Sequence, residues 1–225
     1  MARQRLRGRG MLITLTEVAA KDEADYNEWY NREHIDERVD MQGFRRSRRY
    51  VATKGDPKYL ATYECSKVTD LALPSYLARL ANQTPWSQRV MKRFTKFHRL
   101  TLDIRVDLSH GMGGAITCIR FFPDPAKVRA LTGWLKETLT RAVAMPGMTG
   151  AAAGANDLDV VNAPLKASGG TPVTEVEWVV LLEGSDPATT AAAAREHFSR
   201  QALKPFGMQA APITGTYRFL FGNDR

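Results

Sequence analysis

The sequence predicts an α+β fold built from two tandem repeats, each with the strand and helix order βαββαβ. The segment that begins at Gly10 aligns with the segment that begins at Gly114, 104 residues later. Later segments align at a constant separation of 119 residues, as Tyr59 does with Trp178. Two constant separations that differ by one step indicate a duplication with a single insertion in the second copy.

The first repeat contains four predicted strands and two helical regions. Enrichment in β-branched and aromatic residues, with partial alternation, predicts strands at 11–18, 43–53, 58–66 and 97–106. A helix is expected over 22–40, with Asp22 as its N-cap and acidic residues in its first turn. A second helical region over 69–93 is expected to be broken by Pro74 and Pro85.

The second repeat follows the same order. The pattern predicts strands at 115–122, 147–156, 175–184 and 214–222. Helices are expected at 125–143 and 187–203. The insertion covers about 157–174, where Gly169, Gly170 and Pro172 predict a loop.

A βαββαβ unit is expected to form a ferredoxin-like, four-stranded antiparallel sheet with both helices on one face. The other face needs a cover, which a second sheet can provide. We expect the two repeats of one chain to cover each other, in a dimeric α/β-barrel type of architecture; pairing with a second chain, as a homodimer, is the alternative. The expected segments are a basic tail at 1–10, a first repeat at 11–108, a linker at 109–114 and a degenerate second repeat at 115–225.

Composition excludes several classes of protein. The chain has 225 residues, with 44% hydrophobic and 25% charged, and no apolar run approaches the length of a membrane span. The basic tail precedes an apolar stretch, as in a signal peptide, but Thr14, Thr16 and Glu17 interrupt that stretch. Cys65 and Cys118 form no disulfide framework, so we expect a reducing, cytoplasmic location. The scattered histidines predict no metal site, and no cofactor is expected.

The segment 26–38 carries the most informative residues. At 100° per residue, six aromatic, acidic and imidazole side chains fall within about 140° of a helix: Tyr26, Trp29, Tyr30, Glu33, His34 and Glu37. We predict His34 as a general acid or base, Tyr30 as a hydrogen-bond donor and Glu33 as the carboxylate that orients the imidazole, with Glu37 as its alternative. The competing interpretation is a solvated helix end with a packing histidine.

This segment resembles the EthD-like branch of the dimeric α/β-barrel superfamily. The resemblance rests on Trp29-Tyr30 followed by Glu33-His34, then on Gly43-Phe44 and the basic-aromatic segment 48–50. It covers the first repeat and implies that His34 matches the histidine of the family. It also implies a cofactor-independent enzyme that acts on aromatic or polyketide-like compounds. Gln42 stands where the family usually has proline, which affects the turn more than the chemistry.

The second repeat lacks this set of residues. Trp134 stands near the aromatic position, and Thr138 stands where His34 would be. Neither side chain transfers protons at neutral pH. We therefore expect one active half and one structural half, with two inactive halves as the alternative.

Further substrate-binding residues are predicted outside the helix. Besides Tyr26, Trp29 and Glu37, they are Arg46, Arg48, Tyr50, Trp86 and His98. The second strand is expected to be an edge strand, where its arginines prevent strand pairing. Phe44, Arg46, Arg48 and Tyr50 are expected to share one face, from which an arginine could bind a carboxylate or phenolate. Trp86 is expected to pack over the mouth of the pocket.

The function expected is a cofactor-independent lyase or isomerase, such as a dehydratase, decarboxylase or cyclase. Its partner would be a small, anionic, aromatic molecule, and neither nucleic acid nor a membrane is expected. The βαββαβ order and the net charge of +8 also fit an RNA-recognition module, but the third strand lacks the required aromatic signature. A non-catalytic small-molecule or haem-binding protein and a cofactor-free monooxygenase stay open as alternatives.

Overall fold

The computed structural model describes residues 6–224, so Arg3 and Arg5 of the predicted tail lie outside the described residues. The strands of the first half are β1 (Gly10–Val18), β2 (Phe44–Lys54), β3 (Tyr59–Cys65) and β4 (Phe94–Asp107). Those of the second half are β5 (Ala115–Phe121), β6 (Met148–Asn156), β7 (Trp178–Gly184) and β8 (Ile213–Asp224). Together they confirm the predicted α+β fold with a βαββαβ order in each half.

The eight strands close into one antiparallel barrel in the order β1-β3-β2-β8-β5-β7-β6-β4. Two pairings join the halves: β2 lies against β8, and β4 lies against β6. The barrel interior is packed with side chains from both halves, among them Ile13, Leu60 and Leu102 of the first and Ile116 and Leu181 of the second. The two sheets of one chain therefore cover each other, as expected.

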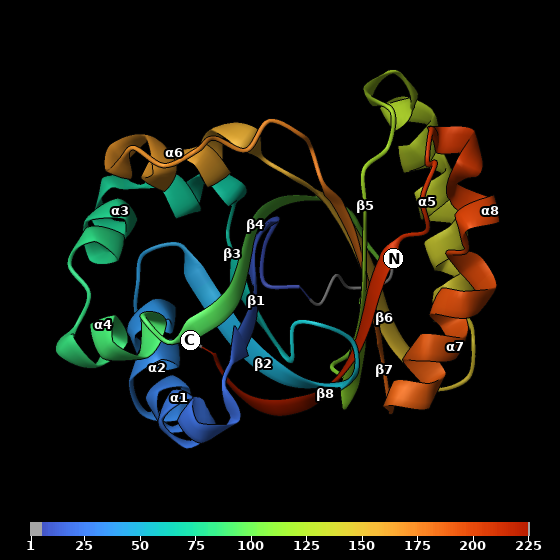
Figure 1. Ribbon diagram of the computed structural model, residues 1–225. Helices are drawn as coiled ribbons and strands as arrows, with labels where there is room; N and C mark the ends of the chain where they lie inside the picture. Colours follow the sequence, from blue (N-terminus) through green and yellow to red (C-terminus); the bar gives the residue numbers. More distant parts are fainter. Residues whose placement is uncertain (1–5, 225) are drawn as a thin grey trace.

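The helices form two separate layers outside the barrel (Figure 1). One layer holds α1 (Glu23–Trp29), α2 (Ile35–Val39), α3 (Pro74–Ala81) and α4 (Pro85–Met91), together with α6 (Leu158–Ser168). The other holds α5 (Val128–Val143), α7 (Pro187–His197) and α8 (Arg200–Leu203). Each layer has its own core cluster against the barrel. The chain therefore offers two places where a ligand could lie between helices and sheet.

The helix expected over 22–40 is interrupted. A turn of π-helix, Tyr30–His34, separates α1 from α2. Single π-turns inside α-helices are rare and occur often at functional sites. Asp22 precedes α1 as expected, but its side chain makes no capping hydrogen bond and instead lies 3.4 Å from Arg93. The irregular turn falls on the residues that the sequence predicts to carry the chemistry.

Two sequence predictions about β2 are wrong. The strand lies between β3 and β8, so it is not an edge strand; barrel closure leaves no edge at that position. The prediction that Phe44 shares a face with Arg46, Arg48 and Tyr50 is wrong for Phe44, because a β-bulge between Phe44 and Arg46 turns Phe44 to the other face. Phe44 packs among the helices, with its ring 5.4 Å from that of Tyr76. Tyr50 lies in the core inside the barrel.

The insertion in the second half is a loop, as predicted, only over residues 169–177. Residues 158–168 form α6, whose N-cap Asp157 accepts a hydrogen bond from the backbone of Val160. The glycines that predicted a loop end this helix, because Gly169 has a φ of 71°. Although α6 belongs to the second half in sequence, it packs on the helix layer of the first half (Figure 1). The insertion thus completes a wall for the other repeat.

Candidate functional site

A hollow of about 210 Å³ lies between the outer face of the first-half sheet and its helices. Strands β1, β3 and β4 form its floor, the π-turn and α3 form its sides, and α6 closes it. Aromatic and aliphatic groups dominate its lining, with a few polar groups among them. The lining residues are Leu12, Thr14, Trp29, Tyr30, His34, Arg38, Tyr63, Tyr76, Leu80, Gln83, Met91, Phe94, Phe97, Arg99, Pro164, Leu165 and Ser168.

His34 lies against the aromatic wall of this hollow and is 8% exposed. Its ring centroid is 4.1 Å from that of Trp29 and 5.1 Å from that of Tyr30. Burial, with a smaller contribution from the positive charges of Arg38 and Arg49, holds the pKa of His34 well below its usual value of 6.5. The imidazole is therefore neutral at physiological pH and able to accept a proton.

The guanidinium of Arg49 stacks on the ring of Tyr30 and holds it in place. The guanidinium carbon of Arg49 lies 4.3 Å from the ring centre of Tyr30. Hydrogen bonds of 2.7 Å to the side chain of Asn27 and 2.9 Å to that of Asn31 fix this guanidinium. The stack fixes the orientation of the Tyr30 ring beside His34.

Two further arginines give the hollow a positive charge. Arg38 contacts Gln83 at 3.4 Å and lies 5.9 Å from the ring centre of Tyr76. Arg99 comes from β4, and both of its terminal nitrogens are buried without a hydrogen-bonding partner among the described residues. No aspartate or glutamate appears among the described residues that line the hollow. The charge of this site therefore favours an anion.

Several buried polar atoms of the residues that line this hollow have no hydrogen-bonding partner among the described residues. They include Nδ1 of His34 and Oγ1 of Thr14 as well as the two nitrogens of Arg99. Thr14 and Arg99 stand directly opposite each other on β1 and β4. Since buried polar groups almost always have a partner, such a cluster around one cavity indicates a place for a polar ligand or water.

The other predicted residues of the helix lie around the hollow, and their side chains contact other groups. Tyr26 packs beneath Tyr30, with ring centroids 5.0 Å apart. The carboxylate of Glu33 accepts hydrogen bonds from Thr84 at 2.6 Å and from Ser87 at 3.2 Å. Glu37 pairs with Arg79 at 3.6 Å, and the indole of Trp86 donates to Asp25 at 2.9 Å. No hydrogen bond joins either glutamate to His34, so both have positions that support the helices.

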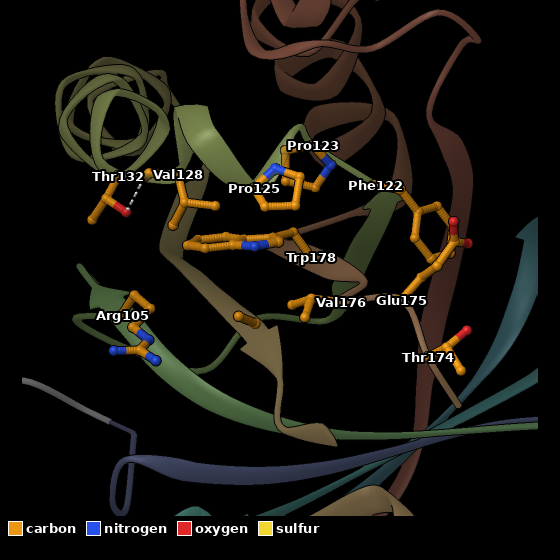
Figure 2. A pocket seen from close by; sticks show the side chains of 11 residues that line it. Arg105, Phe122, Pro123, Pro125, Val128, Thr132, Thr174, Glu175, Val176 and Trp178 are labelled. Carbon is orange, nitrogen blue, oxygen red and sulfur yellow. Dashed lines mark hydrogen bonds between the residues drawn. The ribbon is translucent and has the colours of Figure 1, made fainter. Parts of the chain in front are cut away.

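A larger hollow, of about 590 Å³, lies on the second half of the molecule. Figure 2 shows the flat indole of Trp178 at its centre, beneath Val128 and Pro125, with Phe122 to one side. Arg105 lines it too, but this guanidinium pairs with Asp103 at 3.1 Å. No histidine is among the described residues that line it. This hollow therefore lacks the imidazole that the His34 hollow offers for proton transfer.

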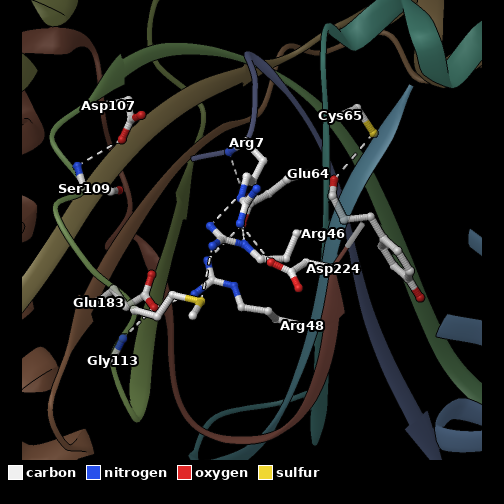
Figure 3. Close-up of polar contacts among 12 residues, drawn as sticks. Arg7, Arg46, Arg48, Glu64, Cys65, Asp107, Ser109, Gly113, Glu183 and Asp224 are labelled. Carbon is white, nitrogen blue, oxygen red and sulfur yellow. Dashed lines mark hydrogen bonds and ion pairs between the residues drawn. The ribbon is translucent and has the colours of Figure 1, made fainter. Parts of the chain in front are cut away.

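Arg46 and Arg48 lie inside one end of the barrel, where they form a closed network of charges (Figure 3). Arg46 binds Glu64 through two hydrogen bonds of 2.9 and 2.8 Å. Arg48 contacts both Glu64, at 3.2 Å, and Glu183 of the second half. The backbone nitrogen of Arg7 adds a hydrogen bond of 2.7 Å to Glu64. These arginines connect the two halves and the tail, and they lie away from the His34 hollow.

His98 lines a third hollow, of about 480 Å³, beside the His34 hollow. Its Nε2 lies 2.7 Å from the carboxylate of Glu177.

The sequence did not predict a role in the site for Arg99, Arg38, Thr14 or α6. No signal in the sequence distinguishes Arg99, because the positions that alternate with Leu100, Leu102 and Ile104 on this strand also include Thr101, Asp103 and Arg105. Its partner across the sheet could not be known without the strand order.

The comparisons with known proteins agree on the fold. No family model and no curated protein matches the chain. An anthrone oxidase-like protein superposes with a TM-score of 0.66 at 11% identity, over 96% of this chain and 92% of the other. A candidate monooxygenase from Lactobacillus acidophilus NCFM gives 0.60 at 13% identity, over 96% and 95%. A candidate chlorite dismutase, TA0507, gives 0.54 at 12% identity, over 95% and 96%.

Likeness at such low identity shows the fold alone, which is that of a ferredoxin-like dimeric α/β barrel with both halves in one chain. The narrower EthD-like resemblance stays a prediction. Among the described residues, no helix has the length and apolar character needed to span a bilayer. The same residues contain no cluster of His, Cys, Asp and Glu that could hold a metal ion.

Proposed function

We propose that the protein is a cofactor-independent enzyme that binds a small, anionic, aromatic or polyketide-like compound in the His34 hollow. One observation carries this proposal: a neutral imidazole and an unpaired guanidinium line the same buried, aromatic cavity. Buried polar groups in proteins usually have a hydrogen-bonding partner, so this pair of groups indicates a place for a polar ligand or water. The aromatic walls suit a flat substrate, and the guanidinium suits its negative charge.

The first chemical step would be transfer of a proton from the substrate to His34. A histidine with a lowered pKa stays deprotonated at physiological pH, and the negative charge that develops on the substrate would stabilise its protonated form during the transfer. The electron pair left behind forms an enolate or phenolate, whose oxygen Arg99 can stabilise in a site that excludes water. Tyr30, fixed by Arg49, can donate a hydrogen bond to the same oxygen. Glu33 supports the α4 side of the site through Thr84 and Ser87.

Two reaction classes can follow this step. In a lyase or isomerase, the anion expels a leaving group or regains the proton at another atom, and oxygen plays no part. In a cofactor-free monooxygenase, the anion reacts with O₂. The lyase or isomerase is the first proposal, and the cofactor-free monooxygenase is the alternative. The names of two structural neighbours, an anthrone oxidase-like protein and a candidate monooxygenase, support keeping this alternative.

A haem-binding function fits the hollow poorly. Its volume of about 210 Å³ lies below the range of about 300–1,000 Å³ that is usual for drug-sized ligands. A haem is larger than most such ligands, so the cavity around His34 would have to open to admit one. We therefore derive no chemistry from a haem.

The test is turnover of a panel of phenolic acids and of anthrone, with and without air. Consumption of substrate is expected in the wild-type protein and is expected to fall strongly in His34→Gln and moderately in Tyr30→Phe. Turnover without O₂ would identify a lyase or isomerase. Uptake of one O₂ per anthrone, with anthraquinone and water as products, would identify a monooxygenase. Unchanged turnover in both variants, or ligand binding without any turnover, would contradict the proposal.

A further inference from the structure

The third hollow, which His98 lines, is a cavity separate from the His34 hollow. Both cavities include Phe97, Arg99, Pro164 and Leu165 in their walls, but none of the described residues that line the third hollow belongs to the π-turn. Strand β4, helix α6 and the loop that follows α6 form most of its walls. Its ligand therefore need not be that of the His34 hollow.

A buried carboxylate holds the ring of His98 at the third hollow. Glu177 is 3% exposed and lies 2.7 Å from Nε2 of His98, and its other oxygen accepts a hydrogen bond of 2.6 Å from Arg120. Burial raises the pKa of Glu177, but the hydrogen bonds from His98 and Arg120 outweigh burial and lower it. An ionised carboxylate only accepts hydrogen bonds, so Nε2 of His98 is the nitrogen that carries the hydrogen.

The other ring nitrogen of His98, Nδ1, is available to a ligand. It has no hydrogen-bonding partner among the described residues, and the side chain of His98 is 39% exposed. In the neutral ring Nδ1 is an acceptor, because the hydrogen is on Nε2. His98 therefore offers one oriented acceptor to a donor group such as a hydroxyl.

The matching position in the second half has no such free group. Tyr217 aligns with His98 at the separation of 119 residues that relates the later parts of the two halves. Its side chain is buried, and its hydroxyl donates a hydrogen bond of 3.3 Å to the backbone oxygen of Pro57. The repeat therefore does not require an exposed, half-paired ring at this position.

Asn156 adds a hydrogen-bond donor to the third hollow. It is 3% exposed, and its side-chain oxygen accepts hydrogen bonds of 2.8 Å from the backbone nitrogen of Thr101 and 3.2 Å from the Thr101 hydroxyl. Because a backbone N–H needs an acceptor, these bonds fix the amide with its oxygen toward Thr101 and its nitrogen away from it. Asn156 lines the hollow, where its amide nitrogen can donate to a ligand oxygen. A hydroxyl, which both donates and accepts, suits this pair of groups.

The walls of the third hollow suit an uncharged, flat ring. Phe97 and Phe122 line it and are 49% and 43% exposed. The acidic side chains of Glu175 and Glu177 also line it, against the positive charge of Arg99. No acidic residue is among the described residues that line the His34 hollow. The third hollow therefore lacks the preference for an anion that the His34 hollow has.

We propose that the third hollow is a second binding site, for an uncharged aromatic alcohol. The hydroxyl of the ligand donates to Nδ1 of His98 and accepts from the amide of Asn156, and its ring lies against Phe97 and Phe122. This site differs from the His34 site in its polar groups and in the charge of its ligand, so each site can be tested without the other.

The role of the hydroxyl can be tested with two fluorescent probes of the same shape. These are 2-naphthalenemethanol and 2-methylnaphthalene, which lacks the hydroxyl. Fluorescence titration of the wild-type protein is expected to give a dissociation constant about threefold to tenfold lower for the alcohol, as for a hydrogen bond between neutral groups. Equal affinities, or tighter binding of the hydrocarbon, would overturn the proposal.

The role of His98 can be tested by substitution and by NMR. His98→Leu is expected to abolish the preference for the alcohol, whereas His110→Leu, a change of an exposed histidine in the linker, is expected to keep it. The chain has four histidines, so the ring-nitrogen signals of His98 can be identified by their absence from His98→Leu. The alcohol is expected to shift the Nδ1 signal of His98, and the hydrocarbon is not. Loss of the preference in both variants, or no shift of this signal at saturation, would overturn the proposal.

The outcomes separate this inference from the proposed function. His34→Gln is expected to leave the dissociation constant of the alcohol within about twofold, because His34 does not line the third hollow. If the alcohol shifts the His98 signal and no phenolic acid or anthrone is turned over, the proposed function is wrong and this site stands. If turnover depends on His34 and the alcohol leaves the His98 signal unchanged, this inference is wrong and the proposed function stands.

Discussion

Arg99 and Arg105 lie on the same strand and face two different hollows. Arg99 faces the His34 hollow, and Arg105 faces the hollow around Trp178. Arg105 is paired with Asp103 at 3.1 Å, and both side chains are partly exposed, at 50% and 29%. The terminal nitrogens of Arg99 are buried and unpaired. A paired surface arginine is a common feature of stable proteins, whereas a buried unpaired one costs free energy unless a ligand binds it.

The helix layers of the two halves differ in the same way. At the position that matches His34, the second half has Thr138, which is buried and accepts a hydrogen bond of 3.0 Å from Arg141. Trp134 fills the space nearby by packing on Phe198 and Phe206, with centroids 5.7 and 5.1 Å apart. At this matching position the second half thus pairs its polar group and packs aromatic rings, whereas the first half leaves Nδ1 of His34 without a partner among the described residues. This contrast at the matching positions supports the prediction that the first half carries the site.

The largest expected effect is on turnover. His34→Gln removes the proton acceptor and is expected to lower kcat by about 10²- to 10⁴-fold. Thr138→Val, the matching change in the second half, is expected to leave kcat within about twofold because Thr138 contacts no hollow that we assign to substrate. Steady-state kinetics on any substrate identified by the panel measures both. Equal losses in the two variants would remove the distinction between the halves.

A smaller effect is expected on ligand binding. Arg99→Met is expected to weaken binding of benzoate about 10- to 100-fold, because it removes a charge-assisted hydrogen bond to the carboxylate. Arg105→Met is the matched control, since it removes the same charge from the same strand and should change affinity less than about twofold. Isothermal titration at two salt concentrations separates the specific contact from a general effect of net charge. Similar losses in both variants would show that only net charge matters.

The smallest effect concerns stability at low pH. The unfolded chain protonates His34 near its usual pKa of 6.5, whereas the folded protein resists protonation until a lower pH. Stability is therefore expected to fall as the pH drops below about 6.5, by at most about 1.4 kcal/mol per pH unit from this residue. His34→Gln should reduce that slope in urea unfolding experiments between pH 7 and pH 5. An unchanged slope would mean that the pKa of His34 is the same in the folded and unfolded protein.

Secondary structure could be predicted well wherever a local pattern decides it. All eight strands lie close to their predicted positions, including the alanine-rich strand β6, which the repeat revealed more clearly than its propensity did. The region 157–174 was assigned as a loop because Gly169 and Pro172 dominate its pattern. The helical residues before them, capped by Asp157, gave a weaker signal than the glycines. Prediction of secondary structure from a local sequence pattern fails for α6 because this helix is short and contains Pro164.

The candidate site was predicted only in part. Trp29, Tyr30 and His34 lie together because three residues within one and a half helical turns must share a region. Arg46 and Arg48 were assigned to substrate binding because an arginine on a strand can serve a ligand or an ion pair, and the sequence does not show which. Their partners Glu64 and Glu183 lie on two other strands, and Glu183 is 135 residues away from Arg48. Only the closed barrel brings these charges together.

The sequence by itself determined the duplication, the order of strands and helices in each half, and the clustering of rings around His34. These follow from periodicity and spacing within short stretches of chain, which local physical chemistry controls. The tertiary structure decided which arginines are paired, which strand has no edge, and that α6 of one half closes a hollow in the other. Those features depend on contacts between segments far apart in the chain, and such contacts exist only after the barrel has closed and fixed which faces point inward.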